Sequence, residues 1–140
     1  MPNLEGRIAL VTSGGEAHPL AFGLAARGAT VVVAMREDAR AEALAGRIAQ
    51  ETGNPRVHSC CIDLASLECV RRGAREFIER YGRLHVLVTD AAVRSEWRLG
   101  HLGPFLLAHL LLDTMKQSGG GRVVRLSVAS DRQHIWSATA

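Results

Sequence analysis

The chain has 140 residues, of which 47% are hydrophobic and 22% are charged. This length and composition suit one globular domain with a hydrophobic core, and they exclude a disordered chain. The net charge is +3, and so small a positive balance, spread along the chain, does not indicate a nucleic-acid partner.

Apolar, β-rich runs alternate with helical patterns from one end of the chain to the other. Such alternation predicts βαβ units with right-handed crossovers, which build an α/β fold around a parallel sheet. We expect a single Rossmann-like domain over residues 1–140, with a doubly wound sheet of five strands in the order 3-2-1-4-5. The expected strands are 7–12, 29–35, 56–63, 84–90 and 122–128, and the expected helices are 19–28, 37–53, 66–82 and 100–121.

Capping residues mark the ends of two predicted helices. Ser66 is a candidate N-cap, and Gly53 and Gly82 stand where helices end with a left-handed residue. In the helix over 66–82, arginines lie beside glutamates, a pattern that indicates a solvated face. The apolar stripe of the helix over 37–53 is expected to include Ala39, Ala43 and Ile48.

The three cysteines are an odd number with two adjacent, so we expect free thiols in a reducing compartment. Along the strand over 56–63, His58 and Cys60 would point to one face and Cys61 and Asp63 to the other. That arrangement disfavours a metal site and favours buried structural cysteines. No apolar run is long enough to span a bilayer and no signal peptide is visible, so we expect a soluble, cytoplasmic protein without a transmembrane segment.

The stretch TSGGEAHPLAFG joins the first predicted strand to the first helix. Gly14 and Gly15 would let backbone N–H groups approach a pyrophosphate at the helix N-terminus. Glu16 would place a negative charge near the phosphates, which is unfavourable. A plain turn between strand and helix is the alternative to a nucleotide loop.

Two further residues lie on the same expected rim. Arg36 follows Gly15 by 21 residues, where a Rossmann fold reads the ribose. An arginine there can pair with the 2′-phosphate of NADP, or it is a surface residue at a helix start. Asp63, at the end of the third strand, can accept a hydrogen bond from an adenine amino group or can cap the next helix.

A family resemblance is carried by GRIALVT, ARGATVVVAMRE, CIDLASL, LHVLVTDAAV, LGPFLLAHLLLDTMK and GRVVRLSV. In series, these stretches resemble the short-chain dehydrogenase/reductase superfamily, especially the retinol-dehydrogenase-like group and its X-linked dehydrogenase/reductase branch. The resemblance implies an NAD(P)-dependent oxidoreductase acting on an alcohol or carbonyl, often a lipid one. It also makes association with the endoplasmic reticulum an expectation.

Carried over position by position, the resemblance implies a cofactor site with several departures from the family. The glycine loop is about two residues short, with Ser13 in place of its first glycine. The arginine at position 36 favours NADP over NAD as the cofactor. The implied cofactor-binding residues are Thr12, Gly14, Gly15, Arg36, Asp63, Leu64 and Ala91.

The catalytic positions implied by the family are altered. The catalytic asparagine aligns with Gly100 and the catalytic serine with Val128, which leaves Ser127 and Ser130 as the nearby candidates. The family also needs a tyrosine with a lysine four residues later, because the lysine lowers the tyrosine pKa toward working pH. The only tyrosine and lysine of this chain, Tyr81 and Lys116, are 35 residues apart.

We therefore expect a truncated family member that is inactive as this chain and incomplete at the C-terminus. A non-catalytic nucleotide-binding or protein-interaction module is one alternative, and a product with little stable function is another. The apolar helix is expected to be buried on most sides, and residues 101–117 are a candidate homodimer surface. The fifth strand is expected to be an open edge of the sheet.

Overall fold

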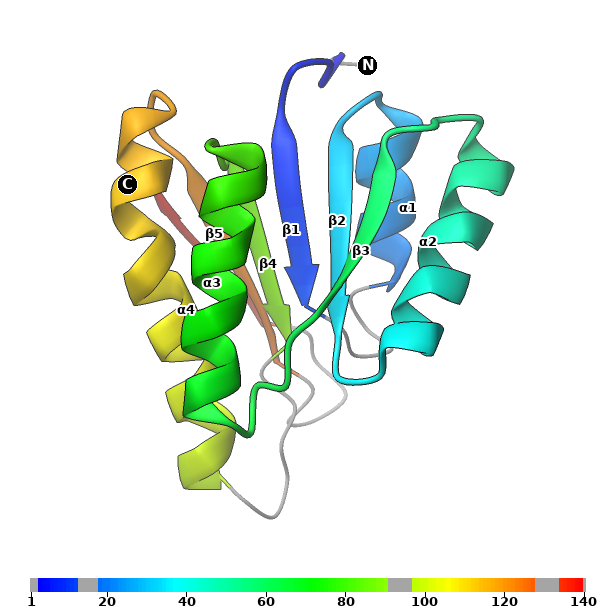
Figure 1. Ribbon diagram of the computed structural model, residues 1–140. Coiled ribbons are helices and arrows are strands. Elements are labelled where there is room, and N and C mark those ends of the chain that lie inside the picture. The colour runs from blue at the N-terminus through cyan, green and yellow to red at the C-terminus, as the bar shows by residue number, and fades with distance from the viewer. Residues whose placement is uncertain (1–2, 13–17, 91–96, 128–133, 140) are drawn as a thin grey trace.

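The computed structural model describes residues 3–12, 18–90, 97–127 and 134–139 (Figure 1). They form one sheet with the strand order β3-β2-β1-β4-β5-β6. The strands are β1 (Ile8–Thr12), β2 (Thr30–Met35), β3 (Val57–Cys61), β4 (Val86–Asp90), β5 (Arg122–Ser127) and β6 (His134–Thr139). The helices are α1 (His18–Ala26), α2 (Asp38–Thr52), α3 (Leu67–Tyr81) and α4 (Trp97–Gln117).

The first five strands are parallel to one another, and their order confirms the predicted doubly wound sheet. The sixth strand, β6, was not predicted. It runs antiparallel to β5, from the pair Arg122 and Thr139 to the pair Ser127 and His134. The expectation that the fifth strand is an open edge is therefore wrong, because residues 134–139 supply hydrogen-bonding partners along its length.

Helices cover both faces of the sheet, with α3 and α4 on one face and α1 and α2 on the other (Figure 1). Alternate residues of β2 face opposite cores. Val31 and Val33 pack in the core that α1 and α2 cover, whereas Val32 and Ala34 pack in the core beneath α3 and α4. Burial on both faces explains why the parallel strands read as continuous apolar runs.

The predicted helix caps are confirmed. The side chain of Ser66 accepts a hydrogen bond from the backbone N–H of Cys69 at the start of α3. Gly53 and Gly82 end α2 and α3 with φ of 73° and 70°, in the left-handed region that glycine adopts without a steric penalty. The helices α2 and α3 thus lie within their predicted ranges, whereas α4 begins three residues before the start, and ends four residues before the end, of the predicted range 100–121.

The predicted stripe of α2 is partly wrong. Ala39 and Ala43 are exposed, and Ile48 is buried as expected. The helix begins at Asp38, and its inward face follows the spacing i, i+3, i+4, i+7 from its fourth residue. The buried residues are Ala41, Leu44, Ala45 and Ile48.

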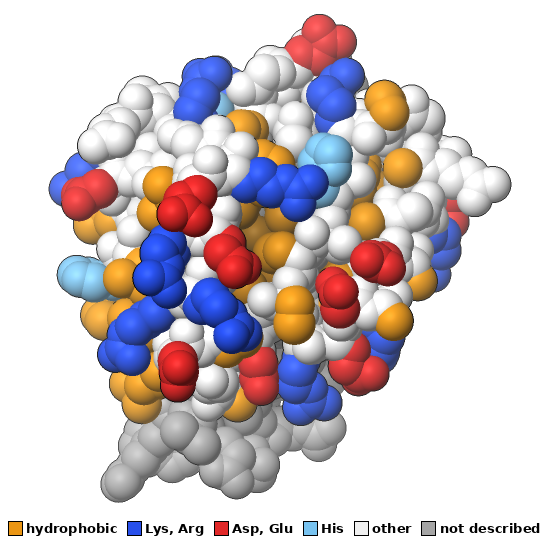
Figure 2. All heavy atoms as spheres, viewed as in Figure 1, with side chains coloured by type: hydrophobic (Ala, Val, Ile, Leu, Met, Phe, Trp, Pro, Cys, Tyr) orange, Lys and Arg blue, Asp and Glu red, His pale blue; other side chains and the backbone are white. Residues whose placement is uncertain are grey.

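The face of the molecule seen in Figures 1 and 2 carries charges of both signs. Figure 2 shows Lys and Arg side chains interspersed with Asp and Glu over this face, with apolar side chains between them. This mixture agrees with the solvated face that the sequence predicts.

One face of α4 is buried and the other carries exposed apolar side chains. Leu107, Leu111 and Met115 are fully buried against the sheet and α3. Leu102 and Phe105 are 48% and 70% exposed, so the expectation of burial on most sides holds for only part of the helix. Among the helices that the structure describes, none has the length and apolar character needed to cross a membrane.

Candidate functional site

A hollow of about 420 Å³ lies at the carboxyl ends of β2 and β3, the edge of a doubly wound sheet where ligands bind. Its walls come from segments far apart in the sequence, because the parallel strands end side by side. The lining residues are His18, residues 34–37, Arg40 and residues 62–65. The hollow thus contains three of the predicted cofactor residues, Arg36, Asp63 and Leu64.

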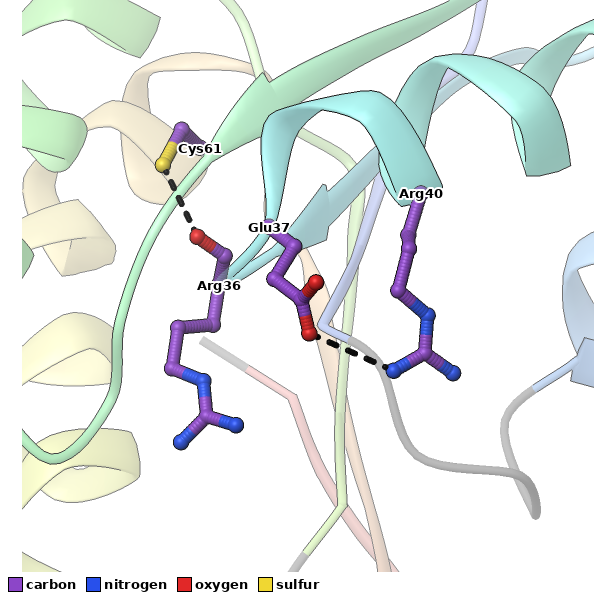
Figure 3. Close-up of polar contacts among 4 residues, drawn as sticks. All are labelled: Arg36, Glu37, Arg40 and Cys61. Atoms are coloured by element: carbon purple, nitrogen blue, oxygen red, sulfur yellow. Dashed lines mark hydrogen bonds and ion pairs between the residues drawn. The ribbon is translucent and has the colours of Figure 1, made fainter.

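Two arginines enter the hollow from the end of β2 and the first turn of α2 (Figure 3). The Arg36 side chain is exposed, and its guanidinium makes no hydrogen bond or ion pair with the described residues. Arg40 pairs with Glu37 at 3.4 Å, and both side chains are more than half exposed. The site therefore holds one guanidinium without a partner among the described residues, and a second that is paired with a carboxylate.

The backbone around Arg36 is fixed by its neighbour on β3. The thiol of Cys61 donates to the carbonyl oxygen of Arg36 at 3.2 Å (Figure 3). The next residue, Ile62, donates its N–H to the carbonyl of Met35 at 2.9 Å. These two bonds join the ends of β2 and β3 and position Arg36 at the rim.

Asp63 shapes the turn that follows β3. Its Oδ1 accepts a hydrogen bond from the N–H of Ala65 at 3.0 Å, and its carbonyl accepts from Ser66. The cap of α3 is Ser66, so the hypothesis that Asp63 itself caps the helix is wrong. One carboxylate oxygen of Asp63 supports the turn, and the other has no hydrogen bond with the described residues.

Leu64 is held from the other side by α4. An ideal Cβ built on Gly103 would overlap the Leu64 carbonyl oxygen and lie 2.8 Å from its carbonyl carbon. Only glycine lets the helix approach the turn so closely. Gly103 therefore sets the distance between α4 and a wall of the hollow.

Thr12 has a structural bond at the end of β1. Its hydroxyl donates to the carbonyl of Val88 on β4 at 3.2 Å, and the residue is 1% exposed. This bond joins the two strands at which the strand order reverses, which is the expected crevice of the fold.

The remaining predicted site residues are not among the described residues that line the hollow. Gly14, Gly15, Ala91 and Ser130 lie outside the described residues, as do Glu16 and Val128. Ser127 is the last residue of β5, at the carboxyl edge of the sheet. The cofactor roles of Gly14, Gly15 and Ala91 and the catalytic roles of Ser127 and Ser130 stay predictions.

The cysteines differ from the expected buried set. Burial raises the pKa of the Cys60 thiol to about 12. Cys61 is exposed, although desolvation and then the nearby Cys69 raise its pKa as well. Within the described ranges, no group of three His, Cys, Asp or Glu side chains could hold a metal ion.

Three residues of the site escaped the sequence reasoning. Arg40 stands in the first turn of α2, four residues after Arg36, and lines the same hollow. Cys61 acts through a bond to a backbone carbonyl, which no sequence pattern reports. Gly103 precedes Pro104 inside an apolar helix, and a glycine at such a place is a signal of close packing.

Comparisons with known proteins agree with this architecture. The family model for short chain dehydrogenase matches residues 7–139. Dehydrogenase/reductase SDR family member 13 of Bos taurus is 41% identical over 95% of this chain and 38% of its own length. Retinol dehydrogenase 13 of Mus musculus is 36% identical over 89% of this chain and 41% of its own length. The chain therefore spans about two fifths of these curated relatives.

Solved structures share the fold. A hydroxysteroid dehydrogenase from Escherichia coli superposes with a TM-score of 0.77 and 26% identity, over 88% of this chain and 54% of that one. An alcohol dehydrogenase from Thermococcus sibiricus, complexed with 5-hydroxy-NADP, gives a TM-score of 0.71 and 25% identity, over 85% and 57% of the two chains. The family resemblance, including the retinol dehydrogenases, is confirmed, whereas the X-linked branch stays a prediction. With strand order, hollow and family match in agreement, the chain belongs to the short-chain dehydrogenase family.

Proposed function

We propose that this chain is the nucleotide-binding part of an oxidoreductase and that its hollow receives the adenosine end of NADP. The observation that carries the proposal is the Arg36 guanidinium, which lies in the hollow without a partner among the described residues. A 2′-phosphate would give this guanidinium a charge-assisted, bidentate acceptor. NAD, with a free 2′-hydroxyl, would leave it without one.

Other residues of the hollow fit the same ligand. The second carboxylate oxygen of Asp63 is available to accept from an adenine amino group. Glu37 weakens the phosphate site, because its carboxylate repels a phosphate and occupies Arg40. Replacing Glu37 by glutamine should therefore strengthen NADP binding by freeing the second guanidinium.

The nicotinamide of such a cofactor supplies or accepts a hydride, and the family chemistry would act on an alcohol or carbonyl, including a lipid one. We propose that the 140-residue chain by itself does not turn over. Tyr81 ends α3, and its ring lies 6.0 Å from that of His58, near the start of β3. Its place is thus at the edge of the sheet opposite the hollow, where it cannot serve as the acid or base of this site.

We further propose that two copies associate through residues 101–117. The exposed Leu102 and Phe105 lie on one side of α4, and the Phe105 ring stacks on that of His109. Exposed apolar groups on one helix face favour burial against a second protein surface. Phe105→Glu should shift the chain to a monomer in sedimentation, while Glu42→Gln on the exposed face of α2 should not.

The absence of a spanning helix among the described residues is compatible with a soluble protein. We propose a cytoplasmic location in a reducing environment, with association with the endoplasmic reticulum following the retinol dehydrogenases. Fractionation of the tagged chain would test this location.

A fluorescence titration with NADPH and NADH tests the proposed function. Binding of NADPH with a Kd below about 1 mM, tighter than that of NADH, is expected. Arg36→Gln should remove the preference, whereas Arg75→Gln, an exposed arginine on α3, should keep it. Consumption of NADPH with a lipid aldehyde should be absent. Turnover would contradict the proposed inactivity, and equal or unmeasurable binding would contradict the cofactor site.

A further inference from the structure

The edge of the sheet opposite the cofactor hollow carries an arginine at the start of three neighbouring strands. Arg7 directly precedes β1, Arg83 lies shortly before β4, and Arg122 is the first residue of β5. Because β1, β4 and β5 are adjacent and parallel, their amino ends lie together (Figure 1). The topology therefore gathers three positive side chains at one edge.

Backbone hydrogen bonds fix this arrangement around His85. The His85 N–H donates to the carbonyl of Ile8, and the His85 carbonyl accepts from the N–H of Arg122, both at 2.9 Å. Two adjoining hollows of about 370 and 430 Å³ open here, and Arg7 and His85 line both. Arg122 lines the first and Arg83 the second.

The imidazole of His85 has no acceptor for its proton among the described residues. Its Nδ1 accepts from the backbone N–H of Ile8 at 2.9 Å, so Nδ1 carries no proton. The neutral ring must then carry its proton on Nε2. Nε2 lies 3.4 Å from an Arg83 nitrogen, which is also a donor. His85 is only 5% exposed, so two donor groups face each other at a buried ring.

The charge balance of the edge favours an anion. Arg7, Arg83 and Arg122 make no ion pair with the described residues, and the only carboxylate that lines either hollow is Glu5. The carboxyl ends of α3 and α4 also point here and add partial negative charge. Their last carbonyls are partly satisfied by the cap at Gly82 and by Ser118, so the three full charges dominate.

We propose that this edge binds the phosphoryl oxyanion of a small molecule, with one oxygen accepting from both His85 Nε2–H and the Arg83 guanidinium. Arg7 and Arg122 then hold the remaining oxygens. Arginine suits this task, because its fork of donors matches phosphate geometry and its charge is permanent. The site is separate from the cofactor hollow, so its success or failure is independent of the proposed function.

The test is a titration of the isotopically labelled chain with inorganic phosphate at constant ionic strength, followed by NMR. We expect a saturable shift of the His85 ring nitrogens and of the Ile8 amide. Arg83→Gln should weaken the phosphate affinity at this site about tenfold, which is one charge-assisted bond. Arg75→Gln makes the same change of charge on the exposed face of α3 and should leave the affinity unchanged.

Two further variants keep the result decisive. Arg36→Gln removes the positive group of the cofactor hollow and should leave the His85 shift intact. If Arg83→Gln fails to fold, Arg122→Gln provides the same test from β5. A His85 signal that does not saturate, or equal weakening in the Arg83 and Arg75 variants, would overturn the proposal. So would a phosphate response confined to the cofactor hollow.

Discussion

Replacing Gly103 by alanine should loosen the wall of the cofactor hollow. The added methyl would lie 2.8 Å from the carbonyl carbon of Leu64 and 3.1 Å from its Cα, and would overlap the carbonyl oxygen. Carbon atoms pack best at about 3.5–4.0 Å, so α4 and the turn after β3 must separate by about 1 Å. Overpacking of this kind costs up to about 3 kcal/mol. Alanine has a helix propensity about 1 kcal/mol more favourable than that of glycine, which offsets part of this cost. The free energy of unfolding should therefore fall by about 2 kcal/mol.

Gly46→Ala on α2 is the matched control, because nothing lies within 4 Å of its added methyl. This variant should gain about 1 kcal/mol from helix propensity alone. Urea unfolding of both variants gives the comparison, and NADPH titration shows whether the moved turn also weakens the site. Equal stability of the two variants would refute the close approach of α4 to Leu64.

Three other predictions concern titration, thiol reactivity and a buried amide. Burial, followed by nearby arginine charge, lowers the pKa of His85 and of His58 below the ordinary 6.5. At a pH between 6.5 and the lower pKa of the folded state, the unfolded chain binds more protons than the folded chain. The free energy of unfolding, measured in urea, should therefore fall as the pH drops below 6.5. A free energy of unfolding that does not change with pH in this range would contradict the prediction. The exposed Cys61 should react with a thiol reagent well before Cys60, because burial raises the pKa of the Cys60 thiol to about 12. Mass spectrometry of the labelled peptides gives the order of reaction, and earlier labelling of Cys60 would contradict the prediction. Asn54 is 6% exposed, and its side-chain amide donates to two backbone carbonyls. Asn54→Ala should therefore lower the free energy of unfolding by about 2–3 kcal/mol. A decrease of less than about 1 kcal/mol would argue against those hydrogen bonds.

Much of the fold could be predicted because the parallel strands are buried on both faces. Runs such as that of β2 are apolar throughout, and glycines such as Gly53 and Gly82 mark where the chain leaves a helix. The last strand, β6, escaped prediction because an antiparallel partner at the edge needs no crossover helix to announce it.

The sequence predicted those residues of the candidate site that lie at or just after the end of a strand. Arg36 and Asp63 lie in the hollow because β2 and β3 are parallel neighbours that end together. The role of Gly103 depends on a contact with Leu64, about forty residues away in the sequence. The basic edge around His85 depends on the order of the strands and on which ring nitrogen of His85 carries the proton. A glycine beside a proline in an apolar helix indicates close packing but does not name Leu64 as the partner, and the basic edge has no local sequence pattern.

The most direct test of the account compares 2′,5′-ADP with 5′-AMP by calorimetry, because these fragments probe only the adenosine end of the hollow. Because Arg36 has no partner among the described residues, the extra 2′-phosphate should tighten binding about tenfold, as one charge-assisted interaction would. Arg36→Gln should abolish the difference, and Arg75→Gln should preserve it. Equal affinities of the two fragments for the unaltered chain would contradict the assignment of the hollow to NADP.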